Sequence, residues 1–271
     1  MPESTNKGVS SRAVPGNAEE FSLAYLERRR RALEQTAWPE DTDSSDPTGP
    51  SGHAYAIRKS KWLTSEFRHN YRKGAMDITP QNVIDVLIAA GVKHWVLMGL
   101  HGYVGYMPEP RATQDVDVLV PYSQQKLVRK AIAERWPALV IEELSQVIRF
   151  KDPADLDSAG APKPVVDVML PWSPLHALIL QEYVVIDGET GHRLPTVEAA
   201  IVSKYASMLS PYRNRARKEQ DAVDFRHLVR ANHDRLDAAV LRRLASLVWE
   251  DGAEEIGRFV ELAVSDEALP I

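Results

Sequence analysis

The chain has 271 residues, of which 44% are hydrophobic and 26% charged, and its formal net charge is −5. This composition is typical of a globular protein and excludes wholesale disorder and the fibrous classes, while the net acidity excludes a polycation that coats nucleic acid. The chain contains no cysteine, which excludes disulfides, thiolate zinc sites and a cysteine nucleophile.

The first 52 residues are expected to form a largely disordered appendage. Residues 1–16 are rich in Ser, Pro, Gly and Asn, a composition that buries little apolar surface. Residues 17–36 predict one helix with the basic run Arg28–Arg31, and residues 38–52 predict a linker. The polar N-terminus shows no secretory signal, and no run of about 18 apolar residues predicts a membrane span. We therefore expect a cytoplasmic protein without a membrane partner.

Residues 53–195 are expected to form an α/β core. Thr79 followed by Pro80 predicts a helix start, and that helix ends near Gly91. The patterns further along predict strands over 94–98, 116–120, 146–150 and 165–170, helices over 100–106 and 123–136, a loop over 152–164, and a short hairpin of 183–186 with 192–194. Residues 53–76 fit no element clearly, and residues 139–150 are ambiguous apart from the strand at 146–150.

Residues 196–271 are expected to be helical to the end of the chain. Four helices are predicted, over 196–209, 215–231, 234–249 and 251–264. The fold class is therefore α+β, with a small mixed sheet and its helices followed by a C-terminal helical bundle.

Three acidic residues indicate a possible site of chemistry. Asp115 and Asp117 flank Val116 at the start of a predicted strand, so their side chains point to the same face. Asp167 is a lone acid in the apolar run 165–170, where an unpaired buried carboxylate is costly. If the two strands are neighbours, three carboxylates surround one site that suits a hard divalent cation such as Mg²⁺. The alternative is that Asp115 and Asp117 are solvated at a strand end and that Asp167 lies at a sheet edge or in a salt bridge.

A glycine turn, Met98-Gly99-Leu100-His101-Gly102, lies between a predicted strand and a predicted helix. Such a turn presents backbone N–H groups to a phosphate. Its spacing matches neither the dinucleotide-binding nor the P-loop motif, and taken alone such a turn is more often an ordinary turn than a phosphate site.

Residues 95–120 resemble the core of the DNA-polymerase-β-type nucleotidyltransferase superfamily, in particular its branch of AbiEii-like toxins and minimal nucleotidyltransferases. The segment Arg111-Ala112-Thr113-Gln114-Asp115-Val116-Asp117 matches the pattern of that family. The run from Leu194-Pro195 to Lys204 and the stretch 215–225 are similar to its later motifs. The resemblance covers about residues 80–230.

The resemblance implies a nucleotidyltransferase core at 53–195 and transfer of a nucleoside monophosphate from a nucleoside triphosphate, ATP among them, to a hydroxyl. Asp115, Asp117 and Asp167 would be the catalytic residues and would hold one or two Mg²⁺ ions. Residues implied in nucleotide binding are Gly99, Arg111, Thr113, Lys204 and Asp221. An RNA or tRNA acceptor, a toxin–antitoxin role and a cognate antitoxin are implied as well. The basic cluster Arg213, Arg215, Arg217 and Lys218 would suit RNA or a triphosphate tail, and Asp224 is expected on an ordinary charged helix face.

One departure from the family pattern leaves two further interpretations open. Leu100 stands where the family has a small residue that approaches the triphosphate. This favours, as the alternative, a catalytically silent relative that binds a nucleotide, a nucleic acid or a protein. A metal-dependent glycosyltransferase that uses Asp115 and Asp117 is a third interpretation, against which the lack of a clear run of βαβ units argues.

Overall fold

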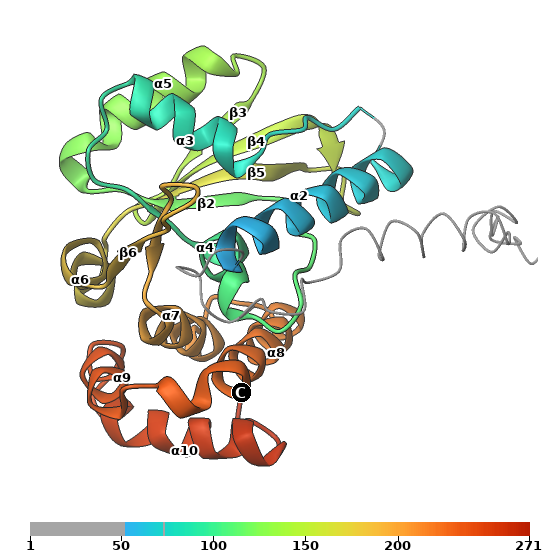
Figure 1. Ribbon diagram of the computed structural model, residues 1–271. Coiled ribbons are helices and arrows are strands. Elements are labelled where there is room, and N and C mark those ends of the chain that lie inside the picture. Colours follow the sequence, from blue (N-terminus) through green and yellow to red (C-terminus); the bar gives the residue numbers. More distant parts are fainter. Residues whose placement is uncertain (1–51, 73) are drawn as a thin grey trace, which may run out of the picture. The chain divides into compact units, whose positions relative to one another are not determined.

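The computed structural model describes residues 52–72 and 74–271, which belong to one compact unit (Figure 1). The helix expected at 17–36 with its basic run Arg28–Arg31, and the linker expected at 38–52 except for Gly52, lie outside the described residues. No helix in the described part has the length and apolarity that a bilayer crossing requires.

A five-stranded mixed sheet lies at the centre of the fold. Its strands, in the order in which they neighbour one another, are β1 (Val96–Leu97), β2 (Val116–Leu119), β5 (Pro162–Met169), β4 (Val147–Leu156) and β3 (Val140–Glu143). β2 and β5 run parallel, and every other neighbouring pair is antiparallel. The two apolar runs predicted as strands are thus adjacent, with Val116 and Val118 buried. A mixed sheet with helices is confirmed.

The prediction of a loop over 152–164 is wrong for most of its length. β4 continues to Leu156 and β5 begins at Pro162, so the turn is confined to 157–161. The register of the two strands shifts between Asp152 and Leu156, where Asp152 accepts hydrogen bonds from the backbone N–H groups of Met76 (2.6 Å) and Ala154 (2.9 Å). Asp152, Pro153 and Asp155, three of the residues that indicated a loop, lie in this irregularity, a position that tolerates them.

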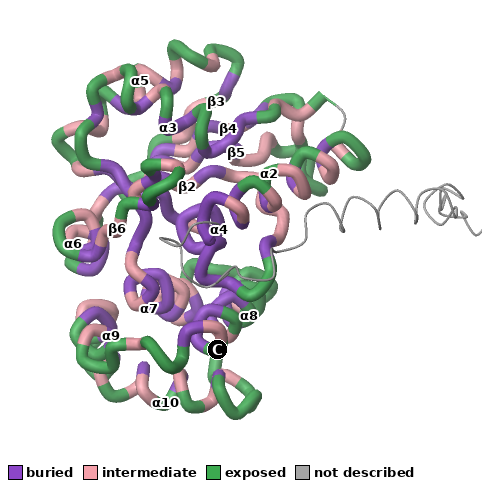
Figure 2. The backbone as a smooth tube through the Cα atoms, viewed as in Figure 1, coloured by how far each residue is buried: buried purple, intermediate pink, exposed green. Residues whose placement is uncertain are grey.

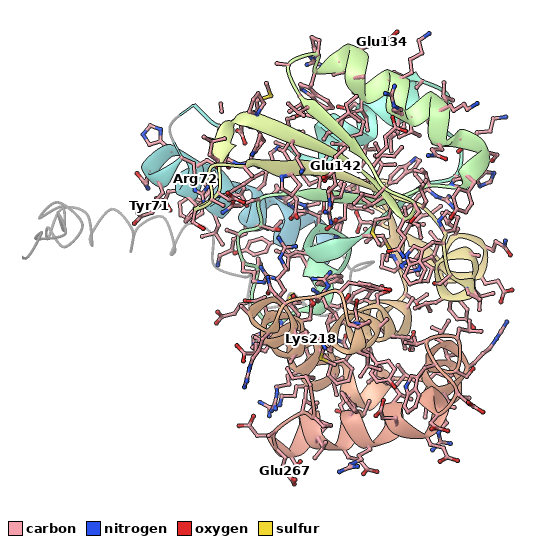
Figure 3. The ribbon with its side chains drawn as sticks, turned by 180° about the vertical axis from the view of Figure 1, so that it is seen from behind. Tyr71, Arg72, Glu134, Glu142, Lys218 and Glu267 are labelled. Atoms are coloured by element: carbon pink, nitrogen blue, oxygen red, sulfur yellow. The ribbon has the colours of Figure 1, made fainter. Side chains whose placement is uncertain are left out.

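Helices formed by the first half of the chain pack against the sheet. Thr79 caps α3 (Pro80–Ala89), as its sequence predicted, and the structure adds a capping box between Thr79 and Asn82. α3 and α5 (Gln125–Arg135) lie together over one face of the sheet (Figure 1). The segment that the sequence left unassigned forms α2 (Gly52–Tyr71). Arg72 follows α2 directly (Figure 3). It pairs with Asp155 of β4 at 2.5 Å.

Short elements connect the sheet with the C-terminal helices. α4 (Gly99–Tyr103) and a 3-10 turn (Val104–Tyr106) follow β1, close to the predicted helix at 100–106. The hairpin of β6 (Val184–Ile186) and β7 (Arg193–Pro195) is confirmed. α6 (Pro174–Glu182) was not predicted, although Ser173 before Pro174 is a capping signal that could have revealed it.

The C-terminal region is helical, as predicted, and gathers into a bundle (Figure 1). Its helices are α7 (Val197–Leu209), α8 (Arg215–Asn232), α9 (Ala238–Ala245) and α10 (Gly252–Ser265). The helix predicted over 234–249 is shorter. It begins after Asp237, which caps the backbone N–H groups of Ala239 and Val240, and it ends at Ala245. Buried residues run continuously from the sheet through α4 into α7 and α8 (Figure 2), so the bundle shares its core with the sheet.

Candidate active site

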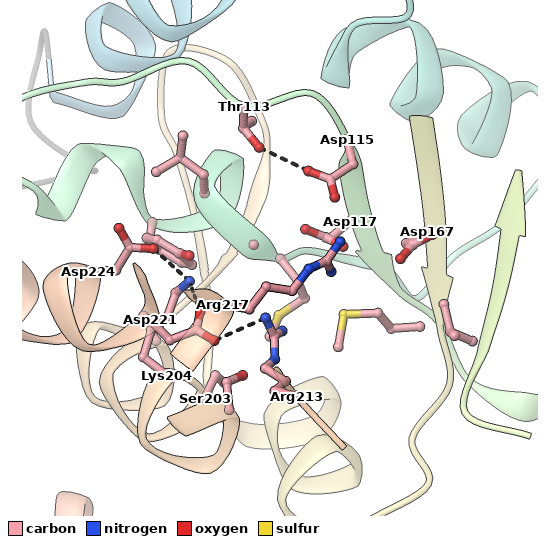
Figure 4. A pocket seen from close by; sticks show the side chains of 18 of the residues that line it. Thr113, Asp115, Asp117, Asp167, Ser203, Lys204, Arg213, Arg217, Asp221 and Asp224 are labelled. Carbon is pink, nitrogen blue, oxygen red and sulfur yellow. Dashed lines mark hydrogen bonds and ion pairs between the residues drawn. The ribbon is translucent and has the colours of Figure 1, made fainter. Parts of the chain in front are cut away.

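Three carboxylates meet on one face of the sheet. Asp117 of β2 lies directly opposite Asp167 of β5 in the parallel register. Asp115 precedes Asp117 by two residues and therefore shares its face. Figure 4 shows the three side chains along one wall of a pocket. The adjacency of the two strands, which the sequence left as a condition, is thus met.

This grouping has an electrostatic cost. Burial, with the charges of Asp115 and Asp167, raises the pKa of Asp117 well above its ordinary value. Burial also raises the pKa of Asp167 to about 6, although the Arg149 guanidinium, 3.3 Å away, acts in the opposite direction. Clustered carboxylates gain from a cation that neutralises them.

Gly99 permits the close approach of α4 to Asp117. Its φ is +57°, and a Cβ built there would lie 1.9 Å from Oδ2 of Asp117. A side chain at this position would displace the carboxylate. The next residue, Leu100, is buried in the apolar core and also contributes to the pocket wall, so this part of the wall offers no side-chain hydroxyl to a phosphate.

A buried ion-pair network lies across the pocket from the carboxylates. Lys204 of α7 contacts Asp221 at 2.8 Å and Asp224 at 2.7 Å, and its Nζ lies 5.1 Å from the centre of the Tyr103 ring. Burial favours a neutral amine, but Tyr103 and the two carboxylates outweigh it and raise the pKa of Lys204. Lys204 is therefore a fixed positive charge in the wall of the pocket.

Two residues of the segment 111–117 form hydrogen bonds that fix acidic side chains of the pocket. Thr113 donates a hydrogen bond of 2.9 Å to Oδ1 of Asp115. Arg111 donates to both carboxylate oxygens of Asp224, at 3.1 and 2.8 Å. The loop before β2 is thereby tied to α8, and Arg111 links the carboxylate wall to the Lys204 network.

The pocket has a volume of about 380 Å³, within the range of small-molecule sites. All eight residues implied in catalysis or nucleotide binding line it: Gly99, Arg111, Thr113, Asp115, Asp117, Asp167, Lys204 and Asp221. Of the predicted basic cluster, Arg215 and Lys218 do not line it. Arg213 and Arg217 lie on its basic side (Figure 4), and Arg213 contacts Asp221 at 3.0 Å. One pocket, hereafter the carboxylate pocket, thus has an acidic and a basic wall.

The acidic wall has the donor chemistry that Mg²⁺ requires. Within 52–72 and 74–271, no three His, Cys, Asp or Glu side chains are arranged so that they could hold a metal ion. Mg²⁺, however, commonly takes only one or two protein carboxylates and completes its shell with water and substrate phosphate. Oδ1 of Asp167 is buried without a hydrogen-bond partner, and burial of such an oxygen is unfavourable unless a ligand satisfies it. These residues therefore fit the ion.

Our expectation for Asp224 is wrong. Its side chain is 0% exposed and pairs with Lys204 and Arg111, instead of lying on a solvated helix face. Burial opposes its charge, yet Lys204 and Arg111 prevail and lower the pKa of Asp224. The three-residue spacing from Asp221 was the available signal, because it places both acids on one face of α8. The sequence analysis did not identify Arg149 as a residue of the site. No local pattern could have indicated it, because its place beside Asp167 depends on the pairing of β4 with β5, which the sequence did not predict.

The chain has only low similarity to known proteins. No family model and no curated protein matches the sequence. An antigenic nucleotidyltransferase-like protein from Paracoccidioides brasiliensis has 12% identity and a TM-score of 0.39, over 78% of this chain and 93% of that one. The antibiotic-resistance factor ANT(2'')-Ia has 15% identity and a TM-score of 0.39, over 68% and 95%. A GTP-bound terminal uridylyl transferase 4 from Trypanosoma brucei has 14% identity and a TM-score of 0.27, over 75% and 70%.

Proposed function

We propose that this protein is a Mg²⁺-dependent nucleotidyltransferase that moves a nucleoside monophosphate from a nucleoside triphosphate to a hydroxyl acceptor. The observation that carries the proposal is the carboxylate pocket itself. Three carboxylates, those of Asp115 before β2, Asp117 on β2 and Asp167 on β5, face a fixed lysine and two arginines across one cavity. Such a pocket suits a polyphosphate, because metal-binding acids and phosphate-binding cations are both present.

In the proposed reaction, the acceptor oxygen bonds to the α-phosphorus while the bond to the pyrophosphate oxygen breaks. Pyrophosphate leaves with the bonding electrons, and the hydroxyl proton passes to Asp167. Lys204, Arg213 and Arg217 bind the phosphate oxygens, and Thr113 orients Asp115. Asp115 and Asp117 would hold Mg²⁺, which supplies neutralisation of the charge on the transferring and leaving phosphates.

A catalytically silent nucleotide-binding relative is the second candidate, and Leu100 is the observation that favours it. Leu100 contributes an apolar side chain to the wall of the carboxylate pocket beside Gly99. A toxin role, an antitoxin partner and an RNA acceptor, which the family resemblance implies, stay predictions.

Calorimetric titration of the four ribonucleoside triphosphates, with and without Mg²⁺, tests the proposal. We expect at least one to bind wild type only with Mg²⁺, and the double variant Asp115→Asn, Asp117→Asn to lose that binding. The control is Asp234→Asn, an acid whose side chain is fully exposed. Binding that survives in the double variant, or the absence of binding by all four, would refute the proposal. Mg²⁺-dependent binding without pyrophosphate release over a broad acceptor panel would favour the silent relative.

A further inference from the structure

A second, larger pocket adjoins the carboxylate pocket. Its volume is about 640 Å³. The two pockets share seven lining residues: Gln146, Met169, Trp172, His176, Ser203, Ser207 and Arg213. A transfer reaction needs room for two substrates, and the carboxylate pocket by itself has the size of one small-molecule site. The second pocket is therefore placed where a second substrate would reach the carboxylates.

Three exposed aromatic side chains from three separate connections converge on this second pocket. Trp172 lies between β5 and α6 and is 51% exposed, Tyr212 lies between α7 and α8 and is 92% exposed, and Trp249 lies between α9 and α10 and is 40% exposed. Large aromatic side chains gain most when they are covered. Their convergence on one cavity points to a ligand with a flat apolar surface. We call this cavity the aromatic pocket.

The aromatic pocket offers little free charge. Arg213 and Glu255 are its charged residues among those described. Arg213 pairs with Asp221, and Glu255 accepts hydrogen bonds from the Tyr205 hydroxyl and from Trp249 Nε1 (3.2 Å). A cationic ligand would find no unengaged carboxylate here. A polyanionic acceptor would find a single arginine, which the proposed transfer already assigns to the phosphates of the nucleotide.

Several polar groups of the aromatic pocket already have hydrogen-bond partners within the protein. His176 shares a 2.7 Å hydrogen bond with Ser173 and lies against the Trp172 ring, with 5.4 Å between ring centres. Ser203 donates to the carbonyl of Ala199 at 2.7 Å. Contact with the ligand therefore falls mainly to ring faces and aliphatic side chains such as Met169 and Leu209.

We propose that the aromatic pocket binds the acceptor, and that this acceptor is a small molecule with an uncharged flat ring and an alcohol group. The inference rests on the proposed nucleotidyl transfer and names its substrate class. With the ring among Trp172, Tyr212 and Trp249, the alcohol reaches the shared wall and attacks the α-phosphorus as described above. Polycationic and polyanionic acceptors are disfavoured by the same lining.

Three matched probes test the class of ligand: 2-naphthalenemethanol, which is neutral, 2-naphthylmethylamine, a cation at pH 7, and 2-naphthoate, an anion. Their binding to the full chain is measured by equilibrium dialysis without nucleotide or metal. We expect the alcohol to bind at least about tenfold more tightly than either charged probe. Tyr212→Leu and Trp172→Leu should each weaken the alcohol by about tenfold, the usual loss for a stacked ring. The matched control Tyr122→Leu, whose tyrosine is 51% exposed and outside the pocket, should bind like wild type.

Several outcomes overturn the inference without touching the proposed transfer. The first is that the alcohol does not bind at millimolar concentration. The second is that a charged probe or a short RNA binds more tightly than the alcohol. The third is that Tyr212→Leu binds the alcohol as tightly as the control Tyr122→Leu does. Competition between the alcohol and Mg²⁺-ATP would assign the pocket to the nucleobase of the donor and also overturn it. Conversely, if the alcohol binds but no nucleotide does, the ring-binding pocket stands while the proposed transfer fails.

Discussion

At the scale of single residues, the fold places the carboxylates of the site close together although their charges repel one another. Asp117 lies between Asp115 and the strand partner Asp167, and its raised pKa expresses a preference for the neutral form. Lys204 is in the opposite situation, because two carboxylates surround it. The acidic wall therefore costs stability in the absence of a cation, whereas the Lys204 network contributes stability.

Asp117→Asn should raise the melting temperature of the metal-free protein at pH 7.5 by roughly 2–4 °C. An acid whose pKa is raised by folding favours the folded state only below that pKa, so its charge destabilises the fold at higher pH. Scanning calorimetry in EDTA measures the change. The gain should vanish near pH 3, where both states carry a protonated acid, and a lower melting temperature at pH 7.5 would contradict this account.

Lys204→Met should lower the free energy of unfolding by about 3 kcal/mol, because it leaves Asp221 and Asp224 buried with fewer positive partners. Urea denaturation at pH 7 measures the loss. Lys130→Met is the matched control, since Lys130 is 72% exposed in a loose pair with Glu134 and such pairs contribute little. Equal stability of the two variants would show that the network is not a stabilising feature.

At the scale of elements, α2 holds the segment that leads to the carboxylates. Ser60, Thr64 and Arg68 recur every four residues and so share one helix face. They donate to three backbone carbonyls of the loop before β2, those of Arg111 (2.6 Å), Thr113 (2.8 Å) and Gln114 (2.7 Å). Thr64 also accepts from the N–H of Thr113 at 3.1 Å. This helix therefore fixes the backbone immediately before Asp115.

Thr64→Val should speed hydrogen exchange of the Thr113 amide, because that N–H loses its acceptor, and should cost about 1–3 kcal/mol of stability. Hydrogen-exchange mass spectrometry over residues 111–117 measures the first effect. Ser65→Ala is the control, since Ser65 is an exposed neighbour on the same helix, and Thr64→Ser should restore protection. Unchanged exchange in Thr64→Val would mean that α2 does not hold the loop.

At the scale of the whole described molecule, one core joins the sheet to the helical bundle. Residues of β1, α4, α7, α8 and α10 belong to a single buried cluster. Three histidines, His53, His101 and His176, are buried as well. Burial lowers the pKa of His53 to about 3 and those of His101 and His176 to about 4. All three are held neutral by the fold, while an unfolded chain would protonate them near pH 6.5.

The three buried histidines should therefore lower the free energy of unfolding as the pH falls from about 6.5 towards 4, whereas the raised pKa values of Asp117 and Asp167 act in the opposite direction. In that window the unfolded state binds more protons, and each buried histidine contributes up to about 1.4 kcal/mol per pH unit. His53→Gln should flatten the dependence by one proton, whereas His94→Gln, at an exposed position, should not. Urea denaturation at several pH values measures the slope, and identical slopes for the two variants would refute the assignment.

The sequence by itself determined most of the local structure. Thr79-Pro80, the apolar runs around Asp117 and Asp167, the 183–195 hairpin and the helices from residue 196 were predicted because caps, turns and periodicity act between near neighbours. The eight candidate residues were also named from the sequence, and the structure brings them into one pocket. Their roles in binding metal and nucleotide stay predictions.

Only the tertiary structure decided which distant groups meet. The parallel pairing of β2 with β5, the extension of β4 through Asp152, the course of α2 and the burial of Asp224 depend on contacts between segments far apart in the chain. No local pattern encodes such contacts, because the free energy that selects them comes from burial and charge pairing of the assembled core. For the same reason the aromatic pocket, built from three separate connections, could not be read from the sequence.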